Sequence, residues 1–559
     1  MSDVFYRNRV VIQLILLFLR IFLYNVKIDN CMNFLLVSIS DPQLEDILAQ
    51  VVSEDFSLSI GCAKSLVGDR VMLHLKRFRA DTKIVIERNY VDKVYRDSYY
   101  TYYASKRTHY KKDVIKLSFF SDSEDFITNE SFFNKESLPL LKKCYRGFIV
   151  LRPTSPYIVG RSAIAPNLLE NHSFKTCLAY ISSSAAGLKV TAQAFPFSSQ
   201  DTETISCAET MVWALMEYYG SKYPEYSPVL PSKILNILKQ NMVERQLPSS
   251  GLSVGSMSYL LKECGFGPKL YSSDEFDGDF FSLLSCYIES GIPVIVALDN
   301  TDAVKDEDDV VERTIGHAVL CIGHEVVDGN LINGMSAVEY PFKDREGVLK
   351  IKDWDKISKK FIFVDDNFPV YQAESLEDPM RRYLEIPEEK YSNKEAKEKA
   401  DKEWGSCKIS HFIVPLHKKT YLEAYVAKKF VKKLLVSNFF KYEDGRELYT
   451  RTFLCSARSY REYVAFGNMS SELKGLIMNK SFPKFVWVTE ISNKLIPEGE
   501  ANGLILLDAT EANVSDFRPL ILAICGGYVV QYDKEEKAVK SSPMVGGCFK
   551  IYDNNLKKL

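Results

Sequence analysis

The stretch that decides the fold is QDTETISCAETMVWALMEYYG, residues 200–220. A polar loop gives way here to a helix that we expect over residues 207–219, because apolar residues recur at helical spacing on one face. Those residues are Met211, Ala214, Leu215 and Tyr218. Thr204 or Ser206 is a suitable N-cap, so Cys207 is predicted to lie at the first turn of the helix.

A thiol in this position is suited to nucleophilic chemistry. The helix dipole and the free N–H groups at a helix N-terminus favour the thiolate, which is the reactive form. A thiol nucleophile also requires a neighbouring base and donors for the developing oxyanion. The alternative interpretation is that Cys207 is a small buried hydrophobe in an ordinary helix, which is the commoner case for a single cysteine.

A candidate base follows on a predicted strand. Residues 291–300 (GIPVIVALDN) and 314–327 (TIGHAVLCIGHEVV) are short apolar runs typical of neighbouring β-strands. His317 lies at the entry of the second run, and the chain contains only seven histidines. A histidine in an apolar strand is more often a packed residue than a base, but at a strand entry it can face a thiol on an adjacent helix.

Two carboxylates end a third apolar run. Residues 361–367 read FIFVDDN, so Asp365 and Asp366 follow the predicted strand directly. A carboxylate at this point can orient the imidazole and stabilise its charged form. The uniformly apolar run does not show which aspartate faces His317, because that depends on strand parity.

These segments, in this order, resemble the successive landmarks of papain-like cysteine peptidases, and they are closest to the compact bacterial C39-like branch. The resemblance covers roughly residues 190–372, and the flanking regions are similar to an uncharacterised bacterial family with the same strand end. It implies an α+β fold in which a helix bearing Cys207 packs on an antiparallel sheet bearing His317. It also implies that Gln200 contributes to the oxyanion hole and that the site uses neither a metal nor an organic cofactor.

The sequence departs from that family in its spacings. Gln200 precedes Cys207 by seven residues, one more than is usual there. His317 and Asp365 are 48 residues apart, so we expect an insertion over about 328–360 that leaves the core and returns. The acidic loop 302–313 lies close to the predicted base; it is either solvated or favours basic substrates.

The composition limits the choice of partners. Lys and Arg number 71 against 73 Asp and Glu, which gives a net charge of −2 and no global field to hold nucleic acid. Residues 90–112 are rich in Tyr, Lys and Arg and could contact single-stranded nucleic acid, but an amphipathic helix is the favoured interpretation. We therefore expect a protein or peptide substrate and no nucleic-acid partner.

Cysteine usage and the N-terminus bear on localisation. The 12 cysteines are scattered without a CxxC pair, which favours a reducing cytoplasm and excludes a zinc knuckle or thioredoxin-type motif. Residues 10–26 are apolar but include Gln13, Arg20 and Asn25. Three interpretations of this stretch compete: a membrane anchor, a buried helix, or an extension upstream of a translation start at Met32. We expect a cytoplasmic protein, with a membrane anchor as the minority alternative.

The sequence thus predicts four regions and one activity. The regions are a hydrophobic extension (1–31), an N-terminal α+β domain (32–146), a papain-like thiol domain (147–417) and a C-terminal α+β domain (418–559). The predicted activity is thiol-dependent acyl transfer, most simply hydrolysis of a peptide or isopeptide bond. A transglutaminase- or deamidase-type transferase with the same triad, and an inactive papain-like scaffold that binds other proteins, remain the alternatives.

Overall fold

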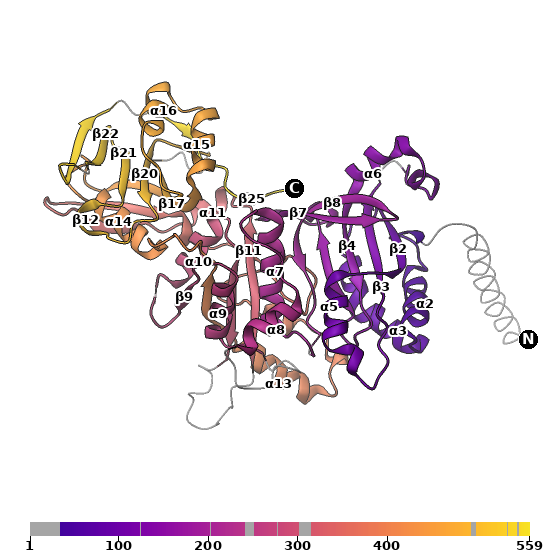
Figure 1. Cartoon of the computed structure of the whole chain (residues 1–559). Helices are drawn as coiled ribbons and strands as arrows, with labels where there is room; N and C mark the ends of the chain where they lie inside the picture. Colours follow the sequence, from indigo (N-terminus) through magenta and orange to yellow (C-terminus); the bar gives the residue numbers. More distant parts are fainter. Residues whose placement is uncertain are drawn as a thin grey trace, which may run out of the picture. The chain divides into compact units, whose positions relative to one another are not determined.

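The computed structural model describes residues 34–122, 125–201, 203–240, 251–276, 278–300, 315–493, 499–533, 535–544 and 547–559. The hydrophobic stretch 10–26 and the acidic loop 302–313 lie outside these ranges. Helices and strands are mixed along the chain, and the strands form several sheets, so the fold class is α+β (Figure 1). Within the described ranges, no helix combines the length and apolar character needed to cross a membrane.

The chain forms two compact units. The first comprises Met1–Glu170 with Ile181–Gln193, and the second comprises Asn171–Tyr180 with Ala194–Leu559. The sequence-based boundaries at 147 and 418 do not coincide with these units. Strands that follow residue 147 complete the first sheet, and residues on both sides of 418 belong to the second unit.

The first unit is built on a seven-stranded sheet with the order β1-β2-β3-β4-β5-β8-β7. These strands are β1 (Phe34–Ser38), β2 (Thr82–Tyr90), β3 (Val114–Ser121), β4 (Tyr145–Leu151), β5 (Val159–Ile164), β7 (Ala179–Ala185) and β8 (Leu188–Phe197). Its helices are α2 (Leu44–Phe56), α3 (Ile60–Leu66), α4 (Met72–Leu75), α5 (Lys93–Thr101) and α6 (Leu138–Cys144). The helix predicted within residues 90–112 is confirmed as α5, which buries Val94 and Tyr95.

The second unit contains the sheet that carries the candidate site. Its main path is β15-β14-β11-β10-β16-β9, and β6 joins β11 to β25. The strands are β6 (Phe174–Cys177), β9 (Lys269–Ser272), β10 (Val294–Asp299), β11 (Gly316–Glu325), β14 (Phe361–Val364), β15 (Gln372–Glu374), β16 (Lys408–Val414) and β25 (Leu556–Lys557). All of these pairings are antiparallel.

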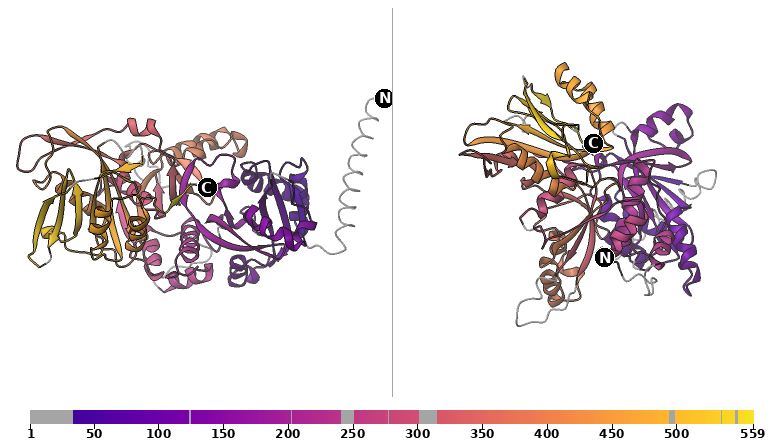
Figure 2. Two further views of the ribbon diagram at one scale, coloured as in Figure 1. Left: turned by 90° about the horizontal axis from the view of Figure 1, so that it is seen from above. Right: turned by 60° about the vertical axis from the view of Figure 1, so that its left-hand side comes forward.

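Helices of the second unit pack around this sheet, and α7 lies against β11 (Figures 1 and 2). They are α7 (Cys207–Lys222), α8 (Pro231–Lys239), α9 (Val254–Glu263), α10 (Phe280–Glu289), α11 (Gly329–Asn333), α12 (Arg381–Leu384) and α13 (Lys394–Gly405). The predicted apolar face of α7 is fully buried. Trp213 on another face of α7 is also buried, because α8 and α9 cover the helix there.

A second sheet of the same unit has the order β12-β13-β17-β18-β20-β21-β22-β23. Its strands are β12 (Val338–Pro341), β13 (Val348–Asp353), β17 (Arg446–Ser456), β18 (Phe485–Ser492), β20 (Gly503–Asp508), β21 (Leu520–Cys525), β22 (Tyr528–Asp533) and β23 (Ala538–Pro543). The accompanying elements are α14 (Ala424–Leu435), α15 (Ala457–Phe466), α16 (Ser471–Met478) and the short pair β19 (Glu500–Ala501) and β24 (Phe549–Lys550).

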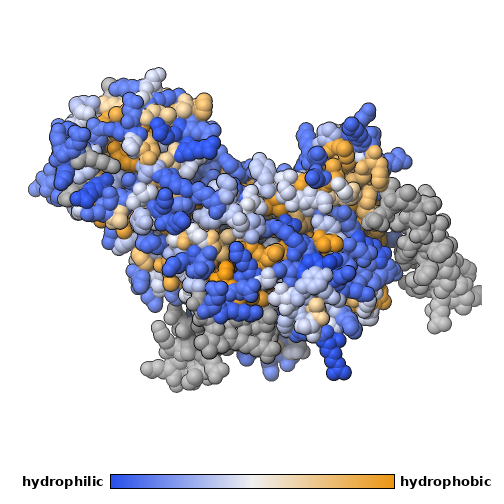
Figure 3. All heavy atoms as spheres, in the orientation of Figure 1, coloured by the Kyte–Doolittle hydropathy of each residue, from blue (hydrophilic) through white to orange (hydrophobic). Residues whose placement is uncertain are grey.

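Apolar side chains of the strands and helices form the buried core of each unit. On the face drawn in Figure 3, hydrophilic residues cover most of the surface, while strands such as β14 and β18 are buried along nearly their whole length. Continuous apolar runs are typical of strands covered on both sides. The apolar run before Asp365 and Asp366 is therefore a core strand that delivers two carboxylates to a buried position.

Candidate thiol active site

Helix α7 begins at Cys207, as predicted from the sequence, and Ser206 is its N-cap. The Ser206 N–H donates to the Glu209 carboxylate over 3.1 Å, and the Ser206 hydroxyl bonds the same group. This capping box satisfies polar groups at the helix start and fixes its first turn. Cys207 is partly exposed at this helix end.

The loop before Cys207 is organised by a buried carboxylate. Asp201 accepts backbone N–H groups of Glu203, Thr204 and Ile205 over 3.0, 2.7 and 3.0 Å. Asp201 is 5% exposed, so these bonds are shielded from water. They set the path of the chain between Gln200 and Cys207.

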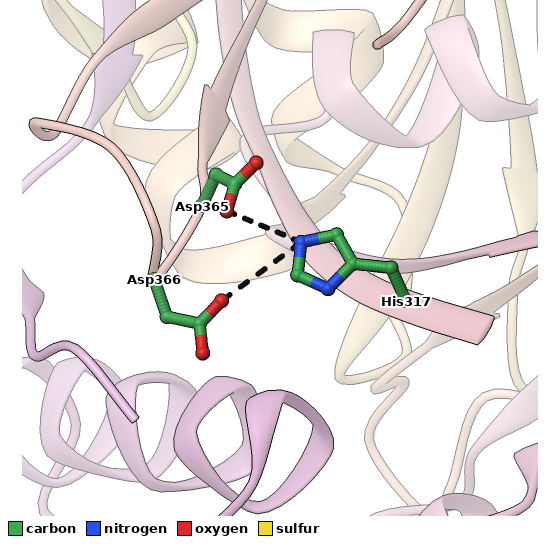
Figure 4. Close-up of side chains that lie close together, drawn as sticks. All are labelled: His317, Asp365 and Asp366. Carbon is green, nitrogen blue, oxygen red and sulfur yellow. Dashed lines mark hydrogen bonds and ion pairs between the residues drawn. The ribbon is translucent and has the colours of Figure 1, made fainter. Parts of the chain in front are cut away.

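His317 lies at the start of β11, where it is paired with Leu298 of β10. Its Nε2 atom lies 3.1 Å from Asp365 Oδ1 and 3.8 Å from Asp366 Oδ1. Figure 4 shows both carboxylates on the Nε2 side of the ring, whereas the second ring nitrogen points away from them. One nitrogen is thus used for orientation, and the other is left for proton exchange.

The pKa of His317 shows which neighbours dominate. Burial alone would lower this pKa, but the Asp365 carboxylate and the Cys207 thiol outweigh burial and hold it well above its ordinary value. Helix α7, which begins at Cys207, packs against β11, which carries His317. Since the three groups come from α7, β11 and the end of β14, the fold brings together residues that are up to 158 positions apart in sequence, Cys207 to Asp365.

The two aspartates differ in their hydrogen bonding. Asp365 accepts from His317 Nε2 and, over 3.0 Å, from the Asn367 backbone N–H. Among the residues that the structure describes, neither oxygen of Asp366 has a hydrogen-bond partner, although its carboxyl is fully buried. The geometry thus brings Asp365 closer than Asp366 to the imidazole and gives it the better support.

Their pKa values differ in the same sense. Burial would raise the pKa of Asp365, but the imidazolium of His317 lowers it below its ordinary value. Burial raises the pKa of Asp366 to about 7; His317 opposes this shift and the charge of Asp365 adds to it. The two adjacent carboxyls therefore differ in their protonation, and Asp365 is the ionised member of the pair near neutral pH.

Tyr383 and Trp404 belong to the site and were not anticipated from the sequence. The Tyr383 hydroxyl donates to Asp365 Oδ2 over 3.0 Å and lies 3.3 Å from His317 Nε2. The Trp404 ring stacks on Tyr383 with ring centroids 3.8 Å apart and meets His317 edge-on at 6.1 Å. These rings shield the His317–Asp365 ion pair from water, which strengthens its electrostatic interaction.

Gln200 lies at the same site. Its Nε2 atom donates to Asn367 Oδ1 over 3.4 Å, so the residue seven positions before Cys207 does approach the end of β14. An amide group carries two N–H donors, and this bond takes one of them. With a spacing of seven residues from Cys207, Gln200 therefore still reaches the residues that follow β14.

The same side chains could also hold a metal ion. Ligand atoms of His317, Asp365 and Asp366 all lie within 4.8 Å of one another. One imidazole nitrogen and two carboxylates suit Zn²⁺ or a similar divalent ion. Such an ion would take the Nε2 atom that now faces Asp365, so it would compete with the orienting hydrogen bond.

The interval between His317 and Asp365 holds α11, β12 and β13. Strands β12 and β13 pair in the other sheet of the unit, where β13 runs parallel to β17. The chain then returns to the first sheet as β14, which pairs with β11. The expected insertion thus leaves the sheet that carries the site and comes back to it.

No family model matches the chain, and no curated protein matches it.

Proposed function

We propose that the chain has a papain-like thiol active site that catalyses acyl transfer, most simply the hydrolysis of a peptide or isopeptide bond. The observation that carries this proposal is the arrangement around His317. One imidazole nitrogen lies 3.1 Å from a buried carboxylate, and Cys207 begins α7, which packs against the strand that carries His317. Asp365 and Cys207 both raise the pKa of this imidazole. Nucleophile, base and orienting group are thus in the order that acyl transfer requires.

In the first half-reaction, Cys207 Sγ attacks the substrate carbonyl carbon while His317 holds the thiol proton. The Gln200 amide and the Cys207 backbone N–H stabilise the tetrahedral oxyanion. As the C–N bond breaks, His317 gives its proton to the departing amine, and a thioester remains on Cys207. Asp365 stabilises the imidazolium throughout, because it keeps its charge in the folded protein.

In the second half-reaction, His317 removes a proton from water, and the hydroxide attacks the thioester carbonyl. Collapse of the second tetrahedral intermediate releases the carboxylic acid and returns the proton to Cys207 sulfur. An amine that replaces water would give transfer instead of hydrolysis, and a glutamine substrate would release ammonia. The two outcomes share every residue and differ only in the acceptor.

The direct test is the reactivity of Cys207 toward iodoacetamide near pH 7, measured for each cysteine by mass spectrometry. Cys144 and Cys264 are suitable internal references, because they are partly exposed like Cys207. We expect Cys207 to react at least about tenfold faster than either, since its thiol has an adjacent base. We expect His317→Ala to remove this advantage.

Two outcomes would overturn the assignment. Equal reactivity of Cys207, Cys144 and Cys264 would indicate a scaffold without an activated thiol. If Cys207 is activated, peptide cleavage, ammonia release and incorporation of a labelled amine are compared for wild type and Cys207→Ala. Loss of only the latter two activities in the variant would favour a transferase over a peptidase.

A further inference from the structure

The candidate site contains a chain of side-chain hydrogen bonds beyond the triad. Gln200 Nε2 donates to Asn367 Oδ1 over 3.4 Å, and Asn367 Nδ2 donates to the Tyr383 oxygen over 3.1 Å. The Tyr383 hydroxyl then contacts Asp365 Oδ2 and Oδ1 over 3.0 and 3.2 Å. This chain connects the proposed oxyanion residue to the carboxylate that orients His317.

The direction of each bond in this chain follows from chemistry. The amide nitrogen of Asn367 can only donate, so the Tyr383 oxygen accepts at that contact. The ionised Asp365 carboxylate can only accept, so the Tyr383 hydrogen is directed to it. All donors therefore point from Gln200 toward Asp365, and bonds aligned in this way polarise one another.

The ring of Tyr383 is held firmly in place. It is 5% exposed, stacks on Trp404 at 3.8 Å, and meets Phe368 edge-on at 4.7 Å. Trp404 comes from α13, which buries none of its residues, and Lys397 of α13 donates to the Leu384 carbonyl of α12 over 2.8 Å. The hydroxyl position is thus fixed by packing and not by the hydrogen bonds alone.

We propose that Tyr383 is a positioning residue that shares the Asp365 carboxylate with His317 and, through Asn367, couples Gln200 to the base. This role deepens the proposed function and rests on it. The Tyr383 hydroxyl lies 3.3 Å from His317 Nε2, the ring nitrogen that faces Asp365. It sets how much of the carboxylate charge acts on the imidazolium. Asn367 sets the orientation of the Gln200 amide in the same way.

Removing the Tyr383 hydroxyl should change the pKa of His317 in a defined direction. In Tyr383→Phe the ring can still stack on Trp404, and the Asn367 backbone N–H still holds Asp365 Oδ1 at 3.0 Å. The carboxylate therefore stays in place but loses a competing donor, so more of its charge acts on His317. We expect the pKa of His317 to rise by about half a unit or more.

The experiment measures two quantities in Tyr383→Phe and in the control Tyr391→Phe, which removes a hydroxyl from a tyrosine of the same segment outside the hydrogen-bond chain. The first is the pH profile of Cys207 alkylation by iodoacetamide. The second is the NMR titration of His317 in a Cys207→Ala background. We expect Tyr383→Phe to shift both the alkaline limb of the alkylation profile and the midpoint of the imidazole titration to higher pH. Tyr391→Phe should leave both unchanged.

If Tyr383 acted through packing alone, Tyr383→Phe would lower the alkylation rate of Cys207 at every pH without moving the alkaline limb of the profile. An imidazole titration that is unchanged in folded Tyr383→Phe would overturn the proposal. Asn367→Ala provides a second variant: its effect on the rate and that of Tyr383→Phe should not add in the double variant, because one chain is broken twice. Additive effects would contradict the coupling.

The two proposals fail in distinguishable ways. If Cys207 is not activated in the wild type, the proposed function fails, but the imidazole titration without the thiol still reports on Tyr383. If Cys207 is activated and the titration does not respond to Tyr383→Phe, only the positioning role fails.

Discussion

Strand β11 carries two buried histidines whose environments look alike and whose behaviour is opposite. His317 Nε2 lies 3.1 Å from Asp365, and His324 Nε2 lies 3.1 Å from Glu289. The residues are seven positions apart on the strand, with a register irregularity between Cys321 and Gly323. Yet the pKa of His317 is raised well above its ordinary value, and the pKa of His324 is lowered.

The difference comes from what else each carboxylate binds. Glu289 forms a buried ion pair with Arg451 over 2.7 Å, so its charge is already balanced. Burial and the charge of Lys359 then lower the pKa of His324 more than Glu289 raises it. Among the described residues, the hydrogen-bond donors to Asp365 other than His317 are uncharged. The charge of Arg382 also lowers the pKa of Asp365, but less than His317 does. A histidine–carboxylate pair is therefore suited to base catalysis when no cation forms a close ion pair with the carboxylate.

The largest expected effect separates the two histidines by activity. We expect His317→Ala to lower the rate of substrate turnover by about 10³-fold, because it removes the general base. His324→Ala should stay within about threefold of wild type, provided that it folds. Steady-state kinetics of the two variants, with far-UV circular dichroism as a folding control, make the comparison; equal losses would contradict it.

The second expected effect concerns stability on the His324 side. Arg451 contacts Glu289 and Glu490, and all three are nearly inaccessible to solvent. Removing Arg451 leaves two buried carboxylates uncompensated, so Arg451→Met should cost about 3–5 kcal/mol of unfolding free energy. Urea denaturation measures this cost.

A matched control for Arg451→Met lies on the surface. Arg381 forms an exposed i,i+4 pair with Glu385, in which both side chains are about two-thirds exposed. Arg381→Met should change the unfolding free energy by less than about 0.5 kcal/mol. A similar cost for both arginine variants would show that the buried network does not stabilise the fold as described.

The smallest expected effect is an opposite pH dependence of stability. The folded-state pKa of His317 is raised, so its contribution is present below its ordinary pKa of 6.5 and is lost as pH rises through the folded value. The folded-state pKa of His324 is lowered, so its contribution is present above 6.5 and decreases as pH falls below that value.

Denaturation of wild type, His317→Gln and His324→Gln from pH 5 to 9 measures both dependences. The free-energy difference between wild type and His317→Gln should shrink toward alkaline pH, and the difference for His324→Gln should shrink toward acidic pH. Two parallel curves would show that the two histidines have the same environment.

The positions of Cys207, His317 and Asp365 could be inferred from local sequence because each stands at the end of a regular element. The helix start at Cys207 follows from the N-cap and the helical spacing, and the strand entry at His317 follows from the apolar run. The choice between Asp365 and Asp366 could not be made, since it depends on how one residue after β14 turns. That turn is fixed by the Asn367 backbone bond.

Tyr383 and Trp404 escaped prediction for a different reason. The segment 388–404 is rich in charged residues, a pattern typical of a solvated helix or linker, and α13 buries none of its residues. The contact of Trp404 with Tyr383 depends on tertiary packing, which helical periodicity does not encode. The one available signal was that Trp404, one of only four tryptophans, ends an otherwise charged helix.

The excursion of the chain between His317 and Asp365 has a consequence for how the protein is made. Strand β13 pairs in parallel with β17, and Asp353 and Asp355 bind Lys428 of α14. Each of these partners follows Asp365 in the sequence. On the ribosome, Cys207, His317 and Asp365 are therefore all synthesised before β13 can dock, so the proposed activity should emerge only late in translation.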